Sequence, residues 1–341
     1  FFFKQKTAYE IKQCDCSSDV CSSDLPKQLL NALNTKPKHG LDNNFKPSAV
    51  LVAGMGGSGI CGTIFTDVFR SDLTLPVFIL KDYEMPAWVN ATTLVIACSY
   101  SGNTEETLAV VDQAINRGAR VICISSGGQL SERSHKHSFP LYTMPGGQPP
   151  RASIAYPFVY LCDIFFRLHI LPDSAASIES LAHFLTQEQS ALQLKAQEIA
   201  QQCFNKLIVV YGFGSNEGVC IRCRQQLNEN SKVLCWHHMF PEMNHNELVG
   251  WVKTPAETVV LGLHTDFDAE QNKKRYRYCK PIFNQAGAET IDIQAKGSTL
   301  LEQSFYLIVF SDWLSCYLAD LKGIDATEVR VIDGLKAFLS T

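Results

Sequence analysis

The chain has 341 residues, which is more than one ordinary domain needs and enough for two domains of roughly 150 residues, each with its own core. Its formal net charge is −4 and the charged residues are well mixed, which excludes a basic stripe for nucleic acid and a polybasic membrane patch. No apolar stretch is long enough to span a bilayer without interruption. Thirteen cysteines at irregular spacings, without a secretory signal pattern, indicate reduced thiols and lead us to expect a cytoplasmic protein.

The first 25 residues differ from the rest of the chain. They show no capping pattern and no sustained apolar period, and Cys14, Cys16 and Cys21 lie among serines and aspartates at spacings that do not suit a tetrahedral zinc site. The apolar triplet precedes the charges, which is the reverse of a signal peptide. Because the segment also resembles a translated sequencing adaptor, we expect residues 1–25 to be spurious or disordered and place the fold after them.

The first half of the chain alternates apolar runs with helical patterns. A helix over residues 27–33 is expected to precede a first strand at 49–54, and further strands are expected at 77–80, 93–98, 121–125 and 139–144. This alternation predicts an α/β domain with a doubly wound parallel sheet and helices on both faces. Ligands of such sheets bind beyond the carboxyl ends of the strands.

A glycine-rich turn follows the first expected strand. Gly54, Gly56 and Gly59 satisfy the spacing G-x-G-x-x-G of dinucleotide-binding turns. That motif also requires an acid at the end of the second strand, where this chain has Lys81 before Asp82, so it is weak evidence for NAD. The same turn, with Gly57 and Ser58 in it, suits a phosphate or sugar that lies against the main chain.

The strongest functional signal is the loop at residues 99–107, which joins a buried strand to a helix. It offers the hydroxyls of Ser99, Ser101 and Thr104, together with the free N–H groups of a first helical turn, and this combination suits a phosphate. The alternative is that Thr104 is only an N-cap, with Glu105 and Glu106 placed to suit the helix dipole. A cap needs one hydroxyl rather than three, so we favour the anion site.

A third loop, at residues 144–152, is rich in Gly and Pro and ends in Arg151. Arg151 could be a solvated surface charge. Its place after a Pro-Pro pair, directly before an apolar helix at 154–166, would also suit a fixed cation that stabilises negative charge.

The second half repeats the pattern of the first. A helical stretch at 173–202 leads to expected strands at 206–214, 233–236, 258–263 and 290–293, so the two halves resemble a diverged repeat of one architecture. Cys220 and Cys223 form a C-x-x-C pair inside an expected helix at 218–227, and we expect them to be packing residues because no second pair accompanies them.

The chain closes with a long helix. Thr299 and Glu302 form a capping-box pattern that opens it, and Gly323 closes it. Lys322 in the last turn is favoured by the helix dipole whatever its function.

Five motifs together resemble one family. They are Gly-Met-Gly-Gly-Ser-Gly, Ser-Tyr-Ser-Gly-Asn-Thr-Glu-Glu-Thr, Gly-Gly-Gln-Pro-Pro-Arg-Ala, the run at residues 226–232 and the run at residues 241–251. The chain is similar to the bifunctional phosphoglucose/phosphomannose isomerases of the SIS-domain (sugar isomerase) superfamily. The resemblance implies two tandem flavodoxin-like SIS domains, the first over residues 26–172 and the second over residues 205–341, joined by a helical linker at 173–204.

The resemblance also assigns roles to residues. Glu229 corresponds to the family's base, which moves a proton between C1 and C2 through a cis-enediol, although by itself it could be a solvated carboxylate. His245 corresponds to a histidine that assists ring opening from the partner subunit of a homodimer, although it could be a hydrogen-bonded loop residue. Lys322 and Arg151 complete the catalytic set. The substrate-binding residues implied by the family are Gly57, Ser58, Ser99, Ser101, Thr104 and Ser315, the last where many members carry Thr.

We therefore expect an aldose–ketose isomerase that interconverts fructose 6-phosphate with glucose 6-phosphate and mannose 6-phosphate, with no cofactor and no metal. Its partner would be the small hexose phosphate, with no nucleic acid and no membrane. Two alternatives stay open at this point. One is a non-catalytic sugar-phosphate sensor built on the same domain, and the other is a nicotinamide-dependent dehydrogenase that uses the G-x-G-x-x-G turn.

Overall fold

The computed structural model describes residues 22–339, apart from residues 36, 38–39 and 255. The sequence analysis set residues 1–25 apart from the fold. Residues 1–21 of that segment lie outside the described range, and residues 22–25 lie within it. Its last four residues are part of the fold: a 3₁₀ turn at Ser22–Asp24 leads into helix α1 (Leu25–Leu33), and the Leu25 side chain is fully buried. Leu25, the last residue of the segment set apart in the sequence analysis, thus contributes to the buried face of α1.

The first half forms a five-stranded parallel sheet in the order β2-β1-β3-β4-β5, which is the flavodoxin-like strand order. Its strands are β1 (Ala49–Ala53), β2 (Val77–Leu80), β3 (Thr93–Ser99), β4 (Arg120–Ser125) and β5 (Leu141–Thr143). Its helices are α2 (Gly56–Val68), α3 (Glu105–Asn116), α4 (Gly128–His137) and α5 (Ala155–Arg167). The doubly wound parallel sheet predicted from the sequence is confirmed.

The second half forms a four-stranded parallel sheet in the order β7-β6-β8-β9, which repeats the first four positions of the first sheet. Its strands are β6 (Leu207–Phe213), β7 (Cys235–Phe240), β8 (Thr258–His264) and β9 (Ala288–Gln294), with helices α7 (Glu217–Glu229) and α8 (Glu270–Gln285) between them. The diverged repeat is confirmed. The strand expected at 233–236 begins two residues later and continues to Phe240.

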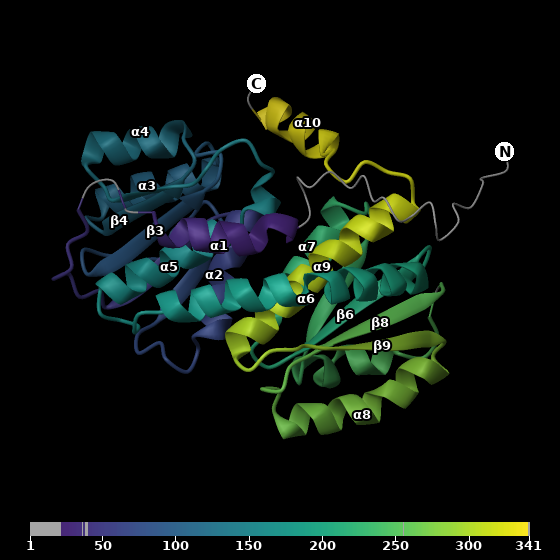
Figure 1. The fold of residues 1–341 in the computed structure, drawn as a ribbon. Helices are drawn as coiled ribbons and strands as arrows, with labels where there is room; N and C mark the ends of the chain where they lie inside the picture. The colour runs from purple at the N-terminus through teal and green to yellow at the C-terminus, as the bar shows by residue number, and fades with distance from the viewer. Residues whose placement is uncertain (1–21, 36, 38–39, 255, 340–341) are drawn as a thin grey trace.

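Two long helices lie between the sheets. Helices α6 (Ala175–Cys203) and α9 (Leu300–Leu321) pack along each other at the centre of the molecule (Figure 1). The capping box of Thr299 and Glu302 is present at the start of α9, and Gly323 ends it with a φ of 64°. Helix α6 is more than a linker, since it buries an apolar face that includes Leu181, Leu185 and Leu192. The sequence analysis did not anticipate α10 (Arg330–Leu339), whose residues are all exposed.

The helices divide the apolar residues into three cores. The largest core lies between the two sheets and is closed by the helices that pack there, while smaller cores lie under α3 and α4 and under α8. Cys220 and Cys223 are both fully buried in the central core, as expected for packing residues. A continuous central core holds the two halves in a fixed arrangement, which fixes the distance between loops at their facing edges.

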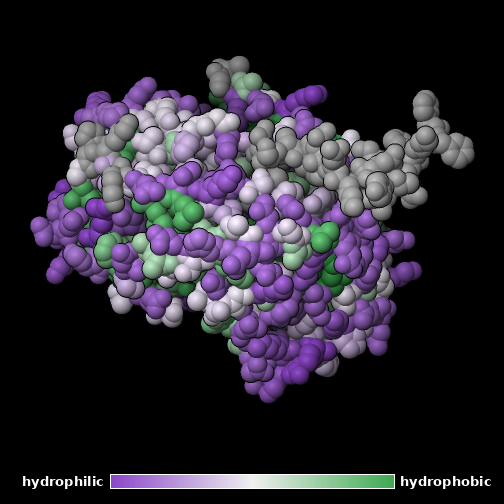
Figure 2. Space-filling view, viewed as in Figure 1, coloured by the Kyte–Doolittle hydropathy of each residue, from purple (hydrophilic) through white to green (hydrophobic). Residues whose placement is uncertain are grey.

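The surface is mainly polar on the face shown in Figure 2, where hydrophobic residues form small separate patches. Across the part of the chain that the structure describes, no helix combines the length and apolar character needed to cross a bilayer.

The two halves meet closely where α2 crosses the start of α7. A Cβ atom on Gly218 would lie 2.8 Å from the backbone nitrogen of Ile64, so only glycine permits this approach. The Gly218 N–H donates to Asp67 Oδ2 at 2.7 Å, and Asp67 is 5% exposed. Burial raises the pKa of the Asp67 carboxyl to about 6, against the lowering effect of this hydrogen bond.

This contact predicts a pH-dependent contribution to stability. Because the folded state binds the Asp67 proton more tightly than the unfolded state, whose aspartate pKa is about 4, stability falls as pH rises from about 4 to 7, by at most roughly 3 kcal/mol. We expect Asp67→Asn to remove this loss, since an amide oxygen still accepts from Gly218. Urea unfolding across this pH range measures it. Asp72→Asn, at an exposed position, is the control, and equal pH slopes for the wild type and Asp67→Asn would contradict the account.

Candidate active site

Three helices of the first half begin at the carboxyl edge of its sheet. Helices α2, α3 and α4 follow β1, β3 and β4, and none of their N-cap residues makes a side-chain capping hydrogen bond. In the first turn of α4, Asn103 Oδ1 accepts from the Gln129 N–H at 3.1 Å. Each first turn therefore presents backbone N–H groups and the positive end of a helix dipole toward the same edge. This is a favourable place for an anion.

The hydroxyls of the 99–107 loop form a small network at this edge. Ser99 Oγ lies 2.8 Å from Thr104 Oγ1 and accepts from the Gly102 N–H at 3.1 Å. Ser101 Oγ accepts from the Asn103 N–H, and Ser58 Oγ accepts from the Tyr100 N–H at 3.3 Å. Thr104 occupies the N-cap position of α3, but its side chain does not cap the helix. Its hydroxyl therefore does not serve the role proposed in the alternative interpretation of this loop.

The glycine turn allows close packing at the same edge. A Cβ atom on Gly59 would lie 2.1 Å from the Gly54 carbonyl oxygen, and one on Gly54 would lie 2.8 Å from that of Cys98. Because α2 approaches the sheet this closely, only glycine fits at Gly54 and Gly59, and this packing explains the spacing of the glycines. At the end of β2 the Lys81 side chain donates to Thr63 Oγ1 on α2, where a dinucleotide site would carry an acid for the ribose.

Arg151 comes from the Gly/Pro-rich loop and reaches the second half of the chain. It is 5% exposed, so it is not the solvated surface charge considered in the sequence analysis. Its Nη1 lies 2.8 Å from Glu229 Oε1, and its Nε donates to Asn230 Oδ1 at 2.7 Å. Its Nη2 donates to the carbonyl oxygens of Ala326 and Thr327. The guanidinium is thus fixed in orientation by four acceptors.

Glu229 is the last residue of α7, and its carboxylate remains partly open, at 31% side-chain exposure. A pocket of about 260 Å³ is lined by Arg151 and Glu229, by Gly56 and Gly57 at the start of α2, and by Ile332 of α10. A Cβ atom on Gly57 would lie 3.0 Å from the Pro150 carbonyl oxygen, so this glycine lets α2 pack against the turn that carries Arg151. The structure thus brings a carboxylate, a buried cation and a helix N-terminus around one cavity.

Asn230 and Ser315 lie behind this pair. Both are fully buried, and Asn230 Nδ2 donates to Ser315 Oγ at 2.9 Å. Ser315 Oγ in turn donates to the Asp312 carbonyl oxygen at 2.7 Å. Ser315 was expected among the substrate-binding residues, but it does not line the pocket beside Glu229.

A buried ion pair supports the same region from α9. Arg222 Nη2 lies 2.6 Å from Asp312 Oδ2 and also donates to the Arg151 carbonyl oxygen at 2.9 Å. Gln226 donates to the other Asp312 oxygen. The sequence analysis missed these three residues. The signal was available, because Arg222 and Gln226 share the helix face of the apolar Cys223 and Leu227, where a charge needs a buried partner.

Lys322 and His245 lie apart from this pocket. Lys322 caps the end of α9, and its Nζ donates to the carbonyl oxygens of Ser231 and Lys232, two and three residues after Glu229. His245 is exposed in a 3₁₀ turn (Glu242–His245) that follows β7. No contact among the described residues joins the His245 ring to Glu229 or Arg151 within one chain.

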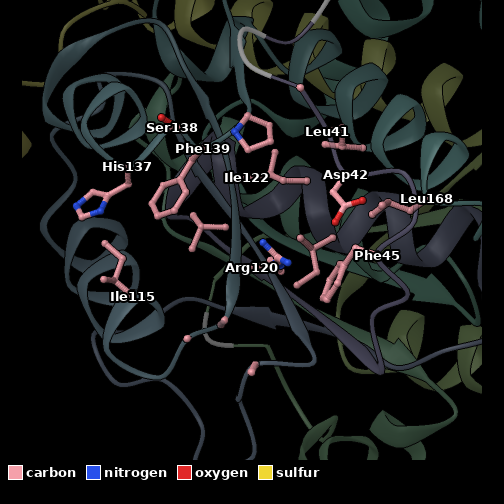
Figure 3. A pocket seen from close by; sticks show the side chains of 17 residues that line it. Leu41, Asp42, Phe45, Ile115, Arg120, Ile122, His137, Ser138, Phe139 and Leu168 are labelled. Atoms are coloured by element: carbon pink, nitrogen blue, oxygen red, sulfur yellow. The ribbon is translucent and has the colours of Figure 1, made fainter.

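Two further features bear on other kinds of site. Among residues 22–339 as described, no cluster of three or more His, Cys, Asp or Glu side chains has the arrangement of a metal site. A larger hollow, of about 480 Å³, lies beside Phe45, Arg120 and Phe139 (Figure 3). Its strand residues Leu94 and Arg120 lie in the first two positions of β3 and β4, so the hollow opens at the amino edge of the sheet, opposite to the loops described above.

Both halves of the chain match known protein families. Residues 45–143 match the SIS domain, and residues 192–339 match the bacterial phospho-glucose isomerase C-terminal SIS domain. The bifunctional phosphoglucose/phosphomannose isomerase of Caldicellulosiruptor bescii is 35% identical over 84% of this chain and 88% of its own length. That of Thermoplasma acidophilum is 34% identical over 86% of this chain and 90% of its own length.

Solved structures show the same fold. The C-terminal domain of glucosamine-fructose-6-phosphate aminotransferase from Francisella tularensis superposes with a TM-score of 0.70 at 13% identity and covers 90% of this chain and 96% of its own. A hypothetical protein from Thermus thermophilus superposes with a TM-score of 0.73 at 15% identity. The match covers 95% of this chain and 90% of that protein. At this identity the structures show the tandem SIS fold alone, while the sequence relatives place the chain in the family of bifunctional phosphoglucose/phosphomannose isomerases.

Proposed function

We propose that this protein interconverts fructose 6-phosphate with glucose 6-phosphate and mannose 6-phosphate by proton transfer through a cis-enediol. The observation that carries the proposal is the pairing of Arg151 with Glu229 at 2.8 Å beside the N-terminus of α2. A carboxylate that moves a proton and a fixed cation that stabilises an enediolate are the two groups that this chemistry requires. The curated relatives are named as isomerases, which favours an enzyme over the sugar-phosphate sensor.

The phosphoryl group is assigned to the carboxyl edge of the first sheet. Ser101 is exposed and Thr104 half-buried, so their hydroxyls can meet a ligand, while Ser99 is 1% exposed and supports Thr104 from behind. Ser58 and Gly57 belong to the first turn of α2, which reaches from this loop to the pocket of Glu229. A hexose phosphate held by its phosphoryl group at this edge would extend its first carbons toward the pocket.

The proton transfer is assigned to Glu229. In the open-chain aldose its carboxylate removes the proton from C2, which gives an enediolate with the negative charge on O1. A proton then passes from O2 to O1, and the carboxylate returns its own proton to C1 to give the ketose. Arg151 faces the same carboxylate through Nη1, and its guanidinium would stabilise the negative oxygen of the enediolate. Since Arg151 is already oriented by its other acceptors, little reorganisation is needed at the moment of reaction.

Ring opening is assigned to His245 and Lys322. The exposed position of His245 suits a histidine that acts in the site of a second copy, so we propose a cytoplasmic homodimer in which each His245 completes the partner's site. Lys322 does not line the pocket, but its ammonium holds the carbonyl oxygens of Ser231 and Lys232, which fixes the backbone that follows Glu229.

The first test concerns the phosphate loop. Thr104→Val removes a hydroxyl assigned to the phosphoryl group, and we expect binding of glucose 6-phosphate to weaken about tenfold, because a hydrogen bond to a charged group contributes roughly 1.5 kcal/mol or more. The melting temperature should fall less than a lost cap would cause, since Thr104 does not cap α3 and its hydroxyl gives up only the hydrogen bond with Ser99 Oγ. Titration calorimetry and thermal unfolding measure the two effects.

Thr299→Val is the matched control, because Thr299 does cap α9. It should lower stability by about 1 kcal/mol and leave binding intact. If Thr104→Val instead loses stability and keeps its affinity, the hydroxyl is a cap and the phosphate assignment is wrong.

The second test concerns the base. Glu229→Gln keeps the shape of the side chain but cannot accept the proton, so turnover of fructose 6-phosphate should fall at least about a thousandfold. Exchange of the substrate's C1 and C2 hydrogens with deuterated water, followed by NMR, should stop as well. Glu217→Gln, at the exposed start of the same helix, is the control. Unchanged turnover in Glu229→Gln would show that another group is the base.

The third test concerns the dimer. Glu229→Gln and His245→Asn should each be inactive, but a mixture allowed to exchange subunits should recover about a quarter of wild-type activity, because half of the dimers then carry one intact site. Failure of the mixture to recover activity, when mass spectrometry shows mixed dimers, would contradict a shared site.

A further inference from the structure

The Arg151 side chain is held by a hydrogen-bond chain that ends on one turn of α9. Arg151 Nε donates to Asn230 Oδ1 at 2.7 Å, Asn230 Nδ2 donates to Ser315 Oγ at 2.9 Å, and Ser315 Oγ reaches the Asp312 carbonyl oxygen at 2.7 Å. Asn230 and Ser315 are fully buried, and Arg151 is 5% exposed. Water therefore does not substitute for any link of the chain.

The direction of each bond in this chain is fixed from both ends. The Nε of an arginine can only donate, so the amide of Asn230 must turn its oxygen to Arg151 and its NH₂ to Ser315. A serine hydroxyl has a single proton, and Ser315 gives it to the Asp312 carbonyl, which can only accept. Ser315 Oγ must then accept from the Asn230 amide. Arg151 at one end of the chain and the Asp312 carbonyl at the other therefore require the same orientation of the Asn230 amide.

The same turn of α9 also holds the backbone of Arg151. The Asp312 carboxylate pairs with Arg222 at 2.6 Å, and Arg222 donates to the Arg151 carbonyl oxygen at 2.9 Å. Asp312 and Arg222 are 0% and 2% exposed. The residue that bears the guanidinium is thus fixed at its main chain and at Nε, which leaves Nη1 aimed at Glu229.

We propose that Asn230 and Ser315 are positioning residues, which set the plane of the Arg151 guanidinium so that Nη1 meets the Glu229 carboxylate and the enediolate. This inference rests on the proposed function for its kinetic consequence, but not for its structural one. Ser315 acts here as a polarised link rather than as a contact of the sugar. A threonine hydroxyl in this place could therefore serve as well as that of serine.

The kinetic test compares substitutions at Ser315. Ser315→Ala removes the acceptor for Asn230 Nδ2 and frees the amide to turn, so we expect kcat for fructose 6-phosphate to fall about tenfold to a hundredfold, while KM changes little. Ser315→Thr keeps the hydroxyl and should retain kcat within about threefold. Asn230→Asp cannot donate to Ser315 and draws the guanidinium toward a second carboxylate, so it should also lose kcat.

Ser311→Ala is the matched control, because Ser311 lies one turn earlier on α9, is equally buried and gives its hydroxyl proton to a helix carbonyl without reaching Arg151. It should keep kcat. If Ser311→Ala and Ser315→Ala lose kcat equally, or if Ser315→Ala keeps wild-type kcat, the positioning role is overturned.

A second readout does not depend on activity. The protein is labelled with ¹⁵N-arginine, and the Arg151 Nε–H signal is assigned as the one missing from the spectrum of Arg151→Lys. NMR then measures the rate at which this proton exchanges with water. We expect slow exchange in the wild type, Ser315→Thr and Ser311→Ala, and exchange at least about tenfold faster in Ser315→Ala. Equal exchange in Ser315→Ala and the wild type would overturn the proposal. A wild type that shows protected Nε–H but no isomerisation would refute the proposed function alone.

Discussion

The burial of one guanidinium is the constraint on which the rest of this site depends. A cation in a nearly dry environment is costly unless its charge is neutralised and its N–H groups are paired, and Arg151 meets both needs with Glu229, Asn230 and two carbonyl oxygens. These partners belong to the second half of the chain, whereas Arg151 belongs to the first. The same interaction that makes the burial tolerable therefore places the candidate base against the candidate stabilising cation.

The fold explains why these groups can meet. The second sheet repeats the strand order of the first four positions of the first sheet, and a continuous core between the sheets fixes their relative position. The N-termini of α2, α3 and α4 lie at the carboxyl edge of the first sheet, and that of α2 packs at Gly57 against the turn that carries Arg151. The second sheet sends α7 into the same space and ends it at Glu229. The candidate phosphate loop thus comes from the first half of the chain and the candidate base from the second, with the N-terminus of α2 reaching from one to the other.

Much of this arrangement could be predicted from the sequence, because it depends on local patterns. Strand and helix alternation gave the two sheets, and the helix capping signals of Thr299 and Gly323 were correct because capping is decided within a few residues. The partners of Arg151 could not be predicted in this way. Asn230, Ser315 and Asp312 are brought together by the packing of α7 on α9, and no spacing in the sequence records that contact. Leu25 was missed because it lay in an excluded segment, whereas α10 was missed although Val331, Leu335 and Phe338 have the spacing of one helix face.

A crystal structure with a phosphorylated aldonohydroxamate, which mimics the enediolate, tests the central claim most directly. We expect the phosphoryl group to lie against Ser101 and Thr104 and the hydroxamate to lie between Glu229 and the Arg151 guanidinium, with the Arg151–Asn230 hydrogen bond kept. A ligand bound with its hydroxamate away from Glu229, or with its phosphoryl group outside the carboxyl edge of the first sheet, would contradict it.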